Sequence, residues 1–227
     1  MRLPVTREDD WEDIPPAGIP KTSQKFGLDS DEKKRKVLQA YYAAVSFMDT
    51  QVGRVLAVLD GMGLRDNTIV VFTSDHGYHL GEHEFWQKSS LHEESARIPL
   101  IIAAPGKRPA VSSSLAQMID LYPTLAEMCG LELPDHLQGR SLAAVLDDPE
   151  TRIHDFVHCA YDSPPRASHL IRTERHAYMA WHDGTAELYD MHADPQQFTN
   201  LAGDEDSEQT LKTLKAHLKT HLEQVAR

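Results

Sequence analysis

The chain has 227 residues, with 23 Lys and Arg against 35 Asp and Glu, which gives a formal net charge of −12 at pH 7. Its 41% hydrophobic and 26% charged residues are typical of a globular chain and exclude disordered and collagen-like classes. The acidic excess argues against a nucleic-acid partner, because proteins that bind phosphate backbones neutralise them with clustered Lys and Arg.

We expect neither a targeting signal nor a disulfide framework in this sequence. No apolar run approaches the roughly 18 residues of a membrane helix, and residues 1–5 do not resemble the apolar core of a signal peptide. We therefore expect no membrane span and no export signal in this chain, which leaves its compartment open. Cys129 and Cys159 fit neither a disulfide framework nor a zinc ribbon.

The first 30 residues contain four prolines and almost no periodicity, so we expect an irregular, linker-like segment over residues 1–30. From Asp31 the pattern changes to an amphipathic helix, which Asp29 or Ser30 can cap and which Gly61 and Gly63 end. The apolar residues at helical spacing are Leu38, Tyr41, Val45, Met48, Val52, Val55 and Leu59.

Two short apolar runs follow the helix, at residues 69–74 and 98–104, and each is typical of a buried strand. A helix followed by a strand, a loop and a second strand favours a mostly parallel α/β sheet flanked by helices, over residues 31–150. A further helix is predicted from Leu115 to Cys129, with Gly130 as its stop.

Residues 151–227 predict a small separate subdomain. Short segments at residues 156–161, 168–173, 177–181 and 187–189 indicate an antiparallel meander. A terminal helix carries Leu211, Leu214, Leu218 and Leu222 on one face. The acidic stretch from Asp183 to Glu208 is interpreted as a solvated face.

The densest chemical signal lies directly after the first predicted strand, in residues 74–83. Ligands of open α/β sheets bind outside the carboxyl ends of strands, so Asp75 and His76 are predicted to face one metal ion. The carboxylate suits Mg²⁺ or Ca²⁺ and the imidazole suits Zn²⁺ or Mn²⁺. Two ligands are too few, so His79 or His83, water and substrate, or residues outside this chain must complete the site. In the alternative interpretation, His76 only hydrogen-bonds the end of the strand.

Lys88 lies twelve residues after His76, where its ammonium can reach an anion held by the metal. Taken alone it reads as a surface lysine; beside Asp75 and His76 we predict a catalytic, substrate-binding role. Tyr78, His79 and Trp86 are candidates for lining a substrate pocket, with an equally weighted alternative in which they cover the core.

The order and spacing of several short blocks resemble the sulfatase family within the alkaline-phosphatase superfamily, with iduronate-sulfatase-like members as the nearest pattern. The resemblance covers most of the chain. The blocks are residues 74–77 (Ser-Asp-His-Gly), 80–83 (Leu-Gly-Glu-His), 86–88 (Trp-Gln-Lys), 93–101, 120–125 (Asp-Leu-Tyr-Pro-Thr-Leu), 138–142 (Gln-Gly-Arg-Ser-Leu), 187–190 (Glu-Leu-Tyr-Asp), 194–195 and 200–202.

The resemblance implies an alkaline-phosphatase-like fold and metal-dependent hydrolysis of a sulfate ester in a sulfated small molecule or carbohydrate. It implies a Ca²⁺ site to which Asp75 and His76 contribute, with Zn²⁺ or Mn²⁺ as the alternative, and a contact of Lys88 with the sulfate. A metal and a lysine together neutralise a tetrahedral oxyanion and polarise it for attack.

Sulfatases attack through a formylglycine made within a Cys/Ser-x-Pro-x-Arg motif, and neither Cys129 nor Cys159 begins that motif. We therefore expect this chain to be the C-terminal portion of a sulfatase and to hydrolyse no sulfate ester alone. Its expected partners are the remaining N-terminal half or a second copy. The alternatives are a phosphodiesterase or phosphonate-ester hydrolase of the same superfamily, and a non-catalytic anion-binding remnant.

Overall fold

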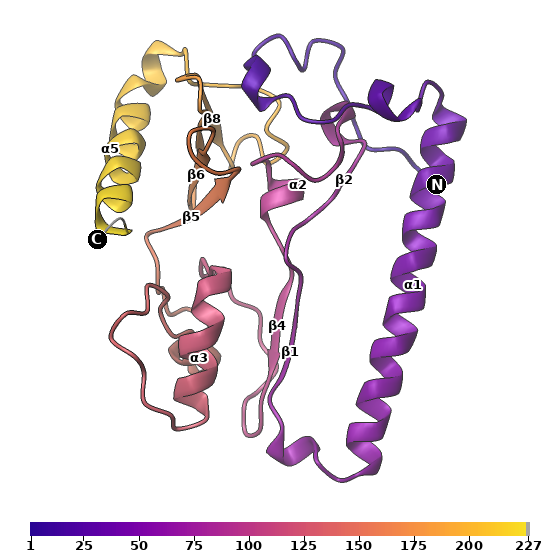
Figure 1. Ribbon diagram of the computed structural model, residues 1–227, viewed down its shortest axis with the longest axis vertical. Coiled ribbons are helices and arrows are strands. Elements are labelled where there is room, and N and C mark those ends of the chain that lie inside the picture. Colours follow the sequence, from indigo (N-terminus) through magenta and orange to yellow (C-terminus); the bar gives the residue numbers. More distant parts are fainter. Residues whose placement is uncertain (226–227) are drawn as a thin grey trace.

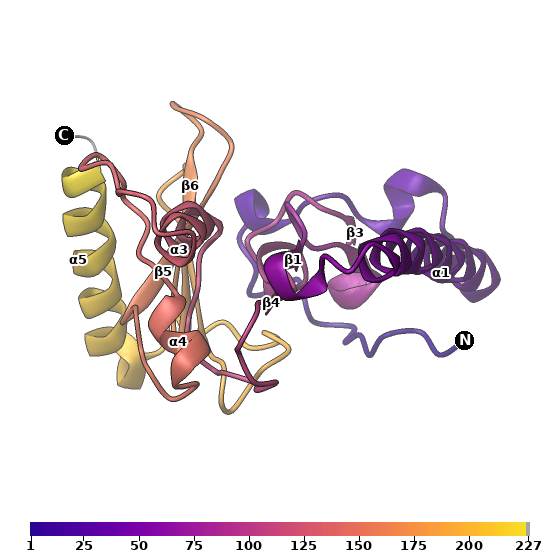
Figure 2. The same ribbon diagram turned by 90° about the horizontal axis from the view of Figure 1, so that it is seen from below.

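The structure is a computed structural model that describes residues 1–225. Figure 1 shows the long helix α1 and the two-stranded sheet of β1 and β4 in one half of the molecule. The other half holds a four-stranded sheet covered by the terminal helix α5. Seen from below in Figure 2, α5, the four-stranded sheet, the β1–β4 pair and α1 follow one another across the molecule.

The N-terminal segment is irregular, as predicted, and contains two short 3-10 helices at Pro16–Gly18 and Ser23–Phe26. It crosses the top of the molecule in Figure 1 and packs against both halves. Asp10, Ile14 and Gly18 are buried in this contact. The segment therefore forms part of the packed structure.

Helix α1 spans Asp31–Gly61, as predicted, and the Ser30 side chain caps it by accepting a hydrogen bond from the Lys33 amide. Gly63, in the left-handed region at φ 68°, ends the turn that follows. Among the helical residues only Leu38 is buried. The exposed apolar side chains include Tyr42, Val45, Phe47, Met48, Val55 and Val58.

The two apolar strands are β1 (Val70–Thr73) and β4 (Leu100–Ala103), and they pair antiparallel, so the predicted parallel pairing is wrong for these strands. A parallel pair needs a crossover that returns the chain to the opposite end of the sheet. Here residues 74–99 start and finish at the same end. They form the β2–β3 pair (His79–Leu80 with Trp86–Gln87) and the one-turn helix α2 (Glu93–Ala96).

Helix α3 (Leu121–Met128) begins at Leu121 rather than at the predicted Leu115, after a 3-10 turn at Met118–Asp120. The buried Asp120 carboxylate explains this start, because it accepts hydrogen bonds from the Gln117 and Arg140 amides and from His154. Three separate segments thus meet at one carboxylate beside α3. The short helix α4 (Ala143–Asp147) follows the Arg140 segment.

The predicted antiparallel meander and the terminal helix are confirmed. Strands β5 (Phe156–Tyr161), β6 (Ser168–Thr173), β7 (His176–Ala180) and β8 (Ala186–Asp190) form an antiparallel meander in sequence order. Helix α5 (Glu208–Val225) covers one face through Leu214 and Leu218, against Ile171, Tyr178 and Leu188. The opposite face carries a second core that includes Leu91, Met179 and Tyr189.

The fold class is therefore α/β with a small antiparallel C-terminal sheet and helix, as predicted. Within residues 1–225, no helix is both long and apolar enough to cross a membrane. Both cysteines are free thiols, and Cys129 is exposed.

Candidate cation and anion site

Asp75 and His76 lie directly after β1, where the chain leaves the strand. The Asp75 side chain is 80% exposed and the His76 side chain 33%. Asp75 Oδ2 lies 3.6 Å from His76 Nε2, a separation at which two side chains can share one cation. The end of the strand thus presents an acid and an imidazole to solvent side by side.

The backbone fixes the proton arrangement of His76. Its Nδ1 lies 2.7 Å from the Gly77 carbonyl oxygen, which can only accept a hydrogen bond. Nδ1 therefore carries the ring proton when the imidazole is neutral, and Nε2 keeps its lone pair free to accept a hydrogen bond or to bind a cation. This arrangement orients many metal-binding histidines in proteins. The contact also matches the alternative interpretation, since His76 does hydrogen-bond the chain beside the strand end.

Lys88 reaches the same point from the segment after β3. Its exposed Nζ donates a hydrogen bond to His76 Nε2 over 2.7 Å. The structure therefore brings Asp75, His76 and Lys88 together, as the sequence analysis predicted for a cation and an anion held side by side. An ammonium next to a cation position is suited to a doubly charged tetrahedral anion.

Gly77 and Ser74 hold the turn that carries these residues. The Gly77 amide donates to the Ser95 carbonyl over 2.8 Å, and a Cβ at this position would overlap the Glu94 backbone oxygen. Only glycine fits so close an approach. Ser74 Oγ donates to the His76 carbonyl over 2.8 Å. Gly77 thus packs against α2, and the sequence analysis assigned no role to Ser74.

Tyr78 follows the turn and packs on α1, with its ring 5.1 Å from that of Tyr41. Burial, and then the nearby Tyr41, raise the pKa of the Tyr78 hydroxyl, so it stays protonated. The side chain is partly exposed and can still donate a hydrogen bond.

His79 and Trp86, the other two candidates for substrate contact, are 0% and 2% exposed. His79 Nε2 lies 2.7 Å from Ser90 Oγ, and burial together with His92 and His83 lowers the pKa of His79, which keeps it neutral. Neither side chain reaches the surface that carries Asp75 and His76.

His83 was a candidate to complete the metal site, and the structure corrects this for both His83 and His79. His83 is 1% exposed, and its Nδ1 lies 2.9 Å from the buried Asp10 Oδ2. Since both imidazoles point into packed structure, they cannot join Asp75 at the end of β1. Any further ligands of a cation at Asp75 and His76 would have to be water, substrate or residues outside the chain.

A buried polar cluster, which the sequence analysis missed, supports the loop from below. Glu187 of β8 is fully buried and accepts hydrogen bonds from Trp181 Nε1 at 2.7 Å and from the Tyr189 hydroxyl at 2.5 Å. His92 Nε2 lies 3.2 Å from the same carboxylate. The interpretation of residues 183–208 as a solvated face is thus wrong for Glu187. The available signal was that Glu187 lies two residues before Tyr189, and residues two apart in a strand point to the same face of the sheet.

The pKa shifts in this cluster follow from burial and from the contacts between carboxylates and imidazoles. Burial would raise the pKa of Glu187, but the charge and hydrogen bond of His92 and the Tyr189 and Trp181 donors lower it, so the carboxylate is ionised. Burial would lower the pKa of His83, but Asp10 raises it above the ordinary value. The loop behind the candidate site is therefore held by two buried contacts between a carboxylate and an imidazole, Glu187–His92 and Asp10–His83.

Asp75 and His76 fit two positions of a divalent-cation site, since one offers ionised oxygens and the other a correctly oriented nitrogen. Among residues 1–225 no group of three or more His, Cys, Asp and Glu side chains converges as a metal site. A divalent cation held by Asp75 and His76 would need further ligands beyond these two side chains.

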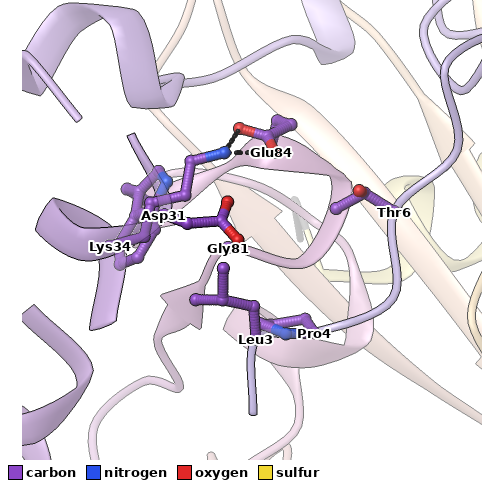
Figure 3. A pocket seen from close by; sticks show the side chains of 8 residues that line it. Leu3, Pro4, Thr6, Asp31, Lys34, Gly81 and Glu84 are labelled. Carbon is purple, nitrogen blue, oxygen red and sulfur yellow. Dashed lines mark hydrogen bonds and ion pairs between the residues drawn. The ribbon is translucent and has the colours of Figure 1, made fainter. Parts of the chain in front are cut away.

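A separate cavity of about 220 Å³ lies between the N-terminal segment, α1 and the β2–β3 pair. Figure 3 shows Lys34 and Glu84 joined across it, with Lys34 Nζ 2.5 and 2.6 Å from the two carboxylate oxygens. Asp31 and Leu3 face the same space. In this ion pair, the positive charge of Lys34 and the negative charge of Glu84 neutralise each other.

Comparisons with known proteins find matching family models, relatives and solved structures. A family model described as Sulfatase matches residues 15–131, and a model described as N-sulphoglucosamine sulphohydrolase, C-terminal, matches residues 81–224. A sulfatase of Formosa agariphila is 33% identical over 226 residues, which cover 96% of this chain and 44% of that protein.

Two solved structures are similar. One is described as a complex with its substrate D-glucosamine-2-N,6-O-disulfate; it has a TM-score of 0.82 and 30% identity over 89% of this chain and 44% of that chain. The other, the phosphonate monoester hydrolase of Agrobacterium radiobacter, has a TM-score of 0.77 and 27% identity over 86% of this chain and 43% of that chain. The chain thus spans less than half the length of each relative.

Proposed function

The chain belongs to the sulfatase family, and on this premise we propose that it supplies the cation-binding and sulfate-binding part of a sulfate-ester hydrolase. One observation carries the proposal, namely the meeting of Asp75, His76 and Lys88 at the exposed end of β1. In this function Asp75 and His76 hold a divalent cation, with Ca²⁺ ahead of Zn²⁺ and Mn²⁺ because an exposed carboxylate is a hard oxygen ligand.

Each residue then has a defined task. His76 keeps its proton on Nδ1 through the Gly77 carbonyl and offers Nε2 outward. Lys88 turns its ammonium from Nε2 to a sulfate oxygen, where it neutralises charge on the anion. Tyr78 stands beside the turn as a neutral hydrogen-bond donor. Asp75 and His76 would hold the cation, which when bound would supply the positive charge that polarises the sulfate for attack. The nucleophile comes from the part of the enzyme that this chain does not match.

A sulfated carbohydrate is the proposed substrate class, in support of which the similar structure was solved with a disulfated glucosamine. The burial of His79 and Trp86 leaves Lys88 and Tyr78 as the substrate contacts that we propose from this chain. A phosphonate monoester is the second candidate, because the Agrobacterium hydrolase is similar over 86% of the chain and both anions are tetrahedral.

We further propose that the exposed apolar face of α1 is covered by the part of the sulfatase fold that lies outside the match. The Formosa relative aligns with 96% of this chain yet extends over more than twice its length. Side chains such as Val55, at 69% exposed, and Val58, at 61%, then lose contact with water in the complete enzyme. Purified chain alone should self-associate, and a Val55→Glu/Val58→Glu variant should sediment as a monomer.

A chimera tests the activity. In the Formosa sulfatase, residues that align with this chain are replaced by residues 1–227, and the purified chimera is assayed with an aryl sulfate and an aryl phosphonate monoester. We expect sulfate hydrolysis that EDTA abolishes and that Lys88→Met reduces by at least tenfold. A folded chimera that prefers the phosphonate would support the second candidate. One that binds cation but hydrolyses neither ester would support the non-catalytic remnant.

A further inference from the structure

A group of imidazoles outside the candidate site lies between the four-stranded sheet and the terminal helix. His158 Nε2 of β5 is 3.0 Å from His169 Nδ1 of β6. The His221 ring of α5 lies 4.7 Å from the His158 ring, centroid to centroid. Three partly buried histidines from three elements thus meet where α5 packs on the sheet.

The register explains why the two sheet histidines meet. His158 pairs with Ile171, and Ile171 belongs to the core that α5 covers. His169 lies two residues before Ile171 and therefore on the same face, diagonal to His158. On α5, His217 and His221 are one turn apart, and both pack on the Phe156 ring, at 5.6 and 5.7 Å.

We propose that His158, His169 and His221 form an acid-sensitive latch, which holds the C-terminal end of α5 on the sheet while the imidazoles are neutral and releases it in mild acid. The bond between His158 and His169 needs one facing nitrogen without a proton, so the pair cannot keep it when both facing nitrogens are protonated. His221 adds a third imidazole that cannot become charged beside two others without repulsion.

The surrounding groups offer these imidazoles little compensation. The segment before α3 contributes Gln117, whose uncharged side-chain oxygen accepts a hydrogen bond from the His158 amide. Burial, and then His221 and His169, lower the pKa of His158 to about 4. Burial and His221 lower the pKa of His169, and burial lowers that of His221. Among residues 1–225, no carboxylate counts among the causes of these three shifts.

The sign of the effect is therefore fixed. Well above pH 6.5 all three imidazoles are neutral whether α5 is docked or free, so pH has no effect there. Below that value the free imidazoles bind protons that the docked ones do not, and docking weakens progressively toward pH 4. For His158 alone, a pKa of 6.5 free and about 4 docked raises the release equilibrium roughly 30-fold at pH 5.

Hydrogen exchange of the full chain tests the latch, with each peptide corrected for its intrinsic exchange rate. We expect protection of residues 215–225 to fall at least tenfold between pH 7 and pH 5, while β7 (His176–Ala180) keeps its protection. The variant His158→Gln/His169→Gln/His221→Gln should lose this pH dependence. The matched control His136→Gln, in an exposed loop, should behave as the unsubstituted chain.

Two results would overturn the proposal, namely α5 protection that does not change with pH and a triple variant that keeps the full dependence. If that variant does not fold, the unsubstituted chain still decides. NMR titration of its imidazoles should give pKa values below 6.5 for His158, His169 and His221, and values at or above 6.5 would refute the latch.

Discussion

Lys88 Nζ lies 2.7 Å from His76 Nε2, so the ammonium occupies the direction in which the imidazole would bind a cation. A cation and Lys88 therefore compete for Nε2, and the lysine must turn outward when the cation binds. The two roles proposed for this site, cation binding by His76 and anion binding by Lys88, are coupled by this one contact.

The first prediction concerns that competition. In NMR titrations of the chain with Mn²⁺, signals of residues around Asp75 and His76 should broaden before all others. Asp75→Ala and His76→Ala should each weaken the effect roughly tenfold or more, whereas Lys88→Met should strengthen it by removing a positive charge. Lys25→Met, in an exposed position, is the matched control. Weaker binding in Lys88→Met would contradict the competition.

Gly77→Ala should destabilise the chain by about 2–4 kcal/mol, because the new methyl group overlaps backbone that cannot move aside easily. Urea unfolding followed by circular dichroism measures this. Gly53→Ala is the control, since that glycine lies within α1 with open space around it and alanine should stabilise the helix by about 0.5–1 kcal/mol. Equal effects at both positions would disprove the close contact at Gly77.

Glu187→Gln should lower the free energy of unfolding by about 3–5 kcal/mol, because it leaves His92 without its carboxylate partner in a fully buried position. The loss should appear as a lower unfolding midpoint in urea with an unchanged slope. Glu132→Gln, at an exposed position, should stay within about 0.5 kcal/mol of the unsubstituted chain. A similarly small change for Glu187→Gln would show that the carboxylate is not required in the core.

Because of the Asp10–His83 pair, we expect the free energy of unfolding to fall as the pH rises into the alkaline range. Because the pKa of His83 is raised above 6.5, its contribution is complete below that value and is lost as pH rises through the folded-state pKa. Asp10→Asn should therefore be less stable than the parent at pH 6, and the gap should narrow by pH 9. Asp9→Asn, which is exposed, serves as the control. A gap that widens with pH would reverse the assigned sign.

Local signals predicted the regular elements well. The apolar spacing and the Ser30 cap placed α1, and the short segments between turn residues placed β5 and β6 at their observed bounds. The direction of β4 was missed because two apolar runs look alike in either orientation. The path of residues 74–99 decides the orientation. This segment contains the β2–β3 pair and a one-turn helix, and no crossover helix that would return the chain to the opposite end of the sheet.

The exposed part of the candidate site also followed from sequence, since Asp75, His76 and Lys88 meet as expected. The burial of His79 and His83 did not, because imidazole is compatible with both surface and core. Ser90 follows His79 by 11 residues within the same loop, whereas Asp10 lies 73 residues before His83 in the irregular N-terminal segment. A polar pair as distant in sequence as Asp10 and His83 is specified by the tertiary packing alone.

The hydrogen bond from the Asn200 amide to Asp13 joins residues 187 positions apart. During synthesis the N-terminal segment leaves the ribosome long before β8 and Asn200 exist, so its docking must wait for nearly the whole chain. Until then Asp10 and His83 can come into contact only without the packing that β8 and Asn200 later provide. The loop beneath the proposed cation position therefore becomes rigid among the last events of folding. In a stalled nascent chain this loop would lack its contacts with the N-terminal segment and β8.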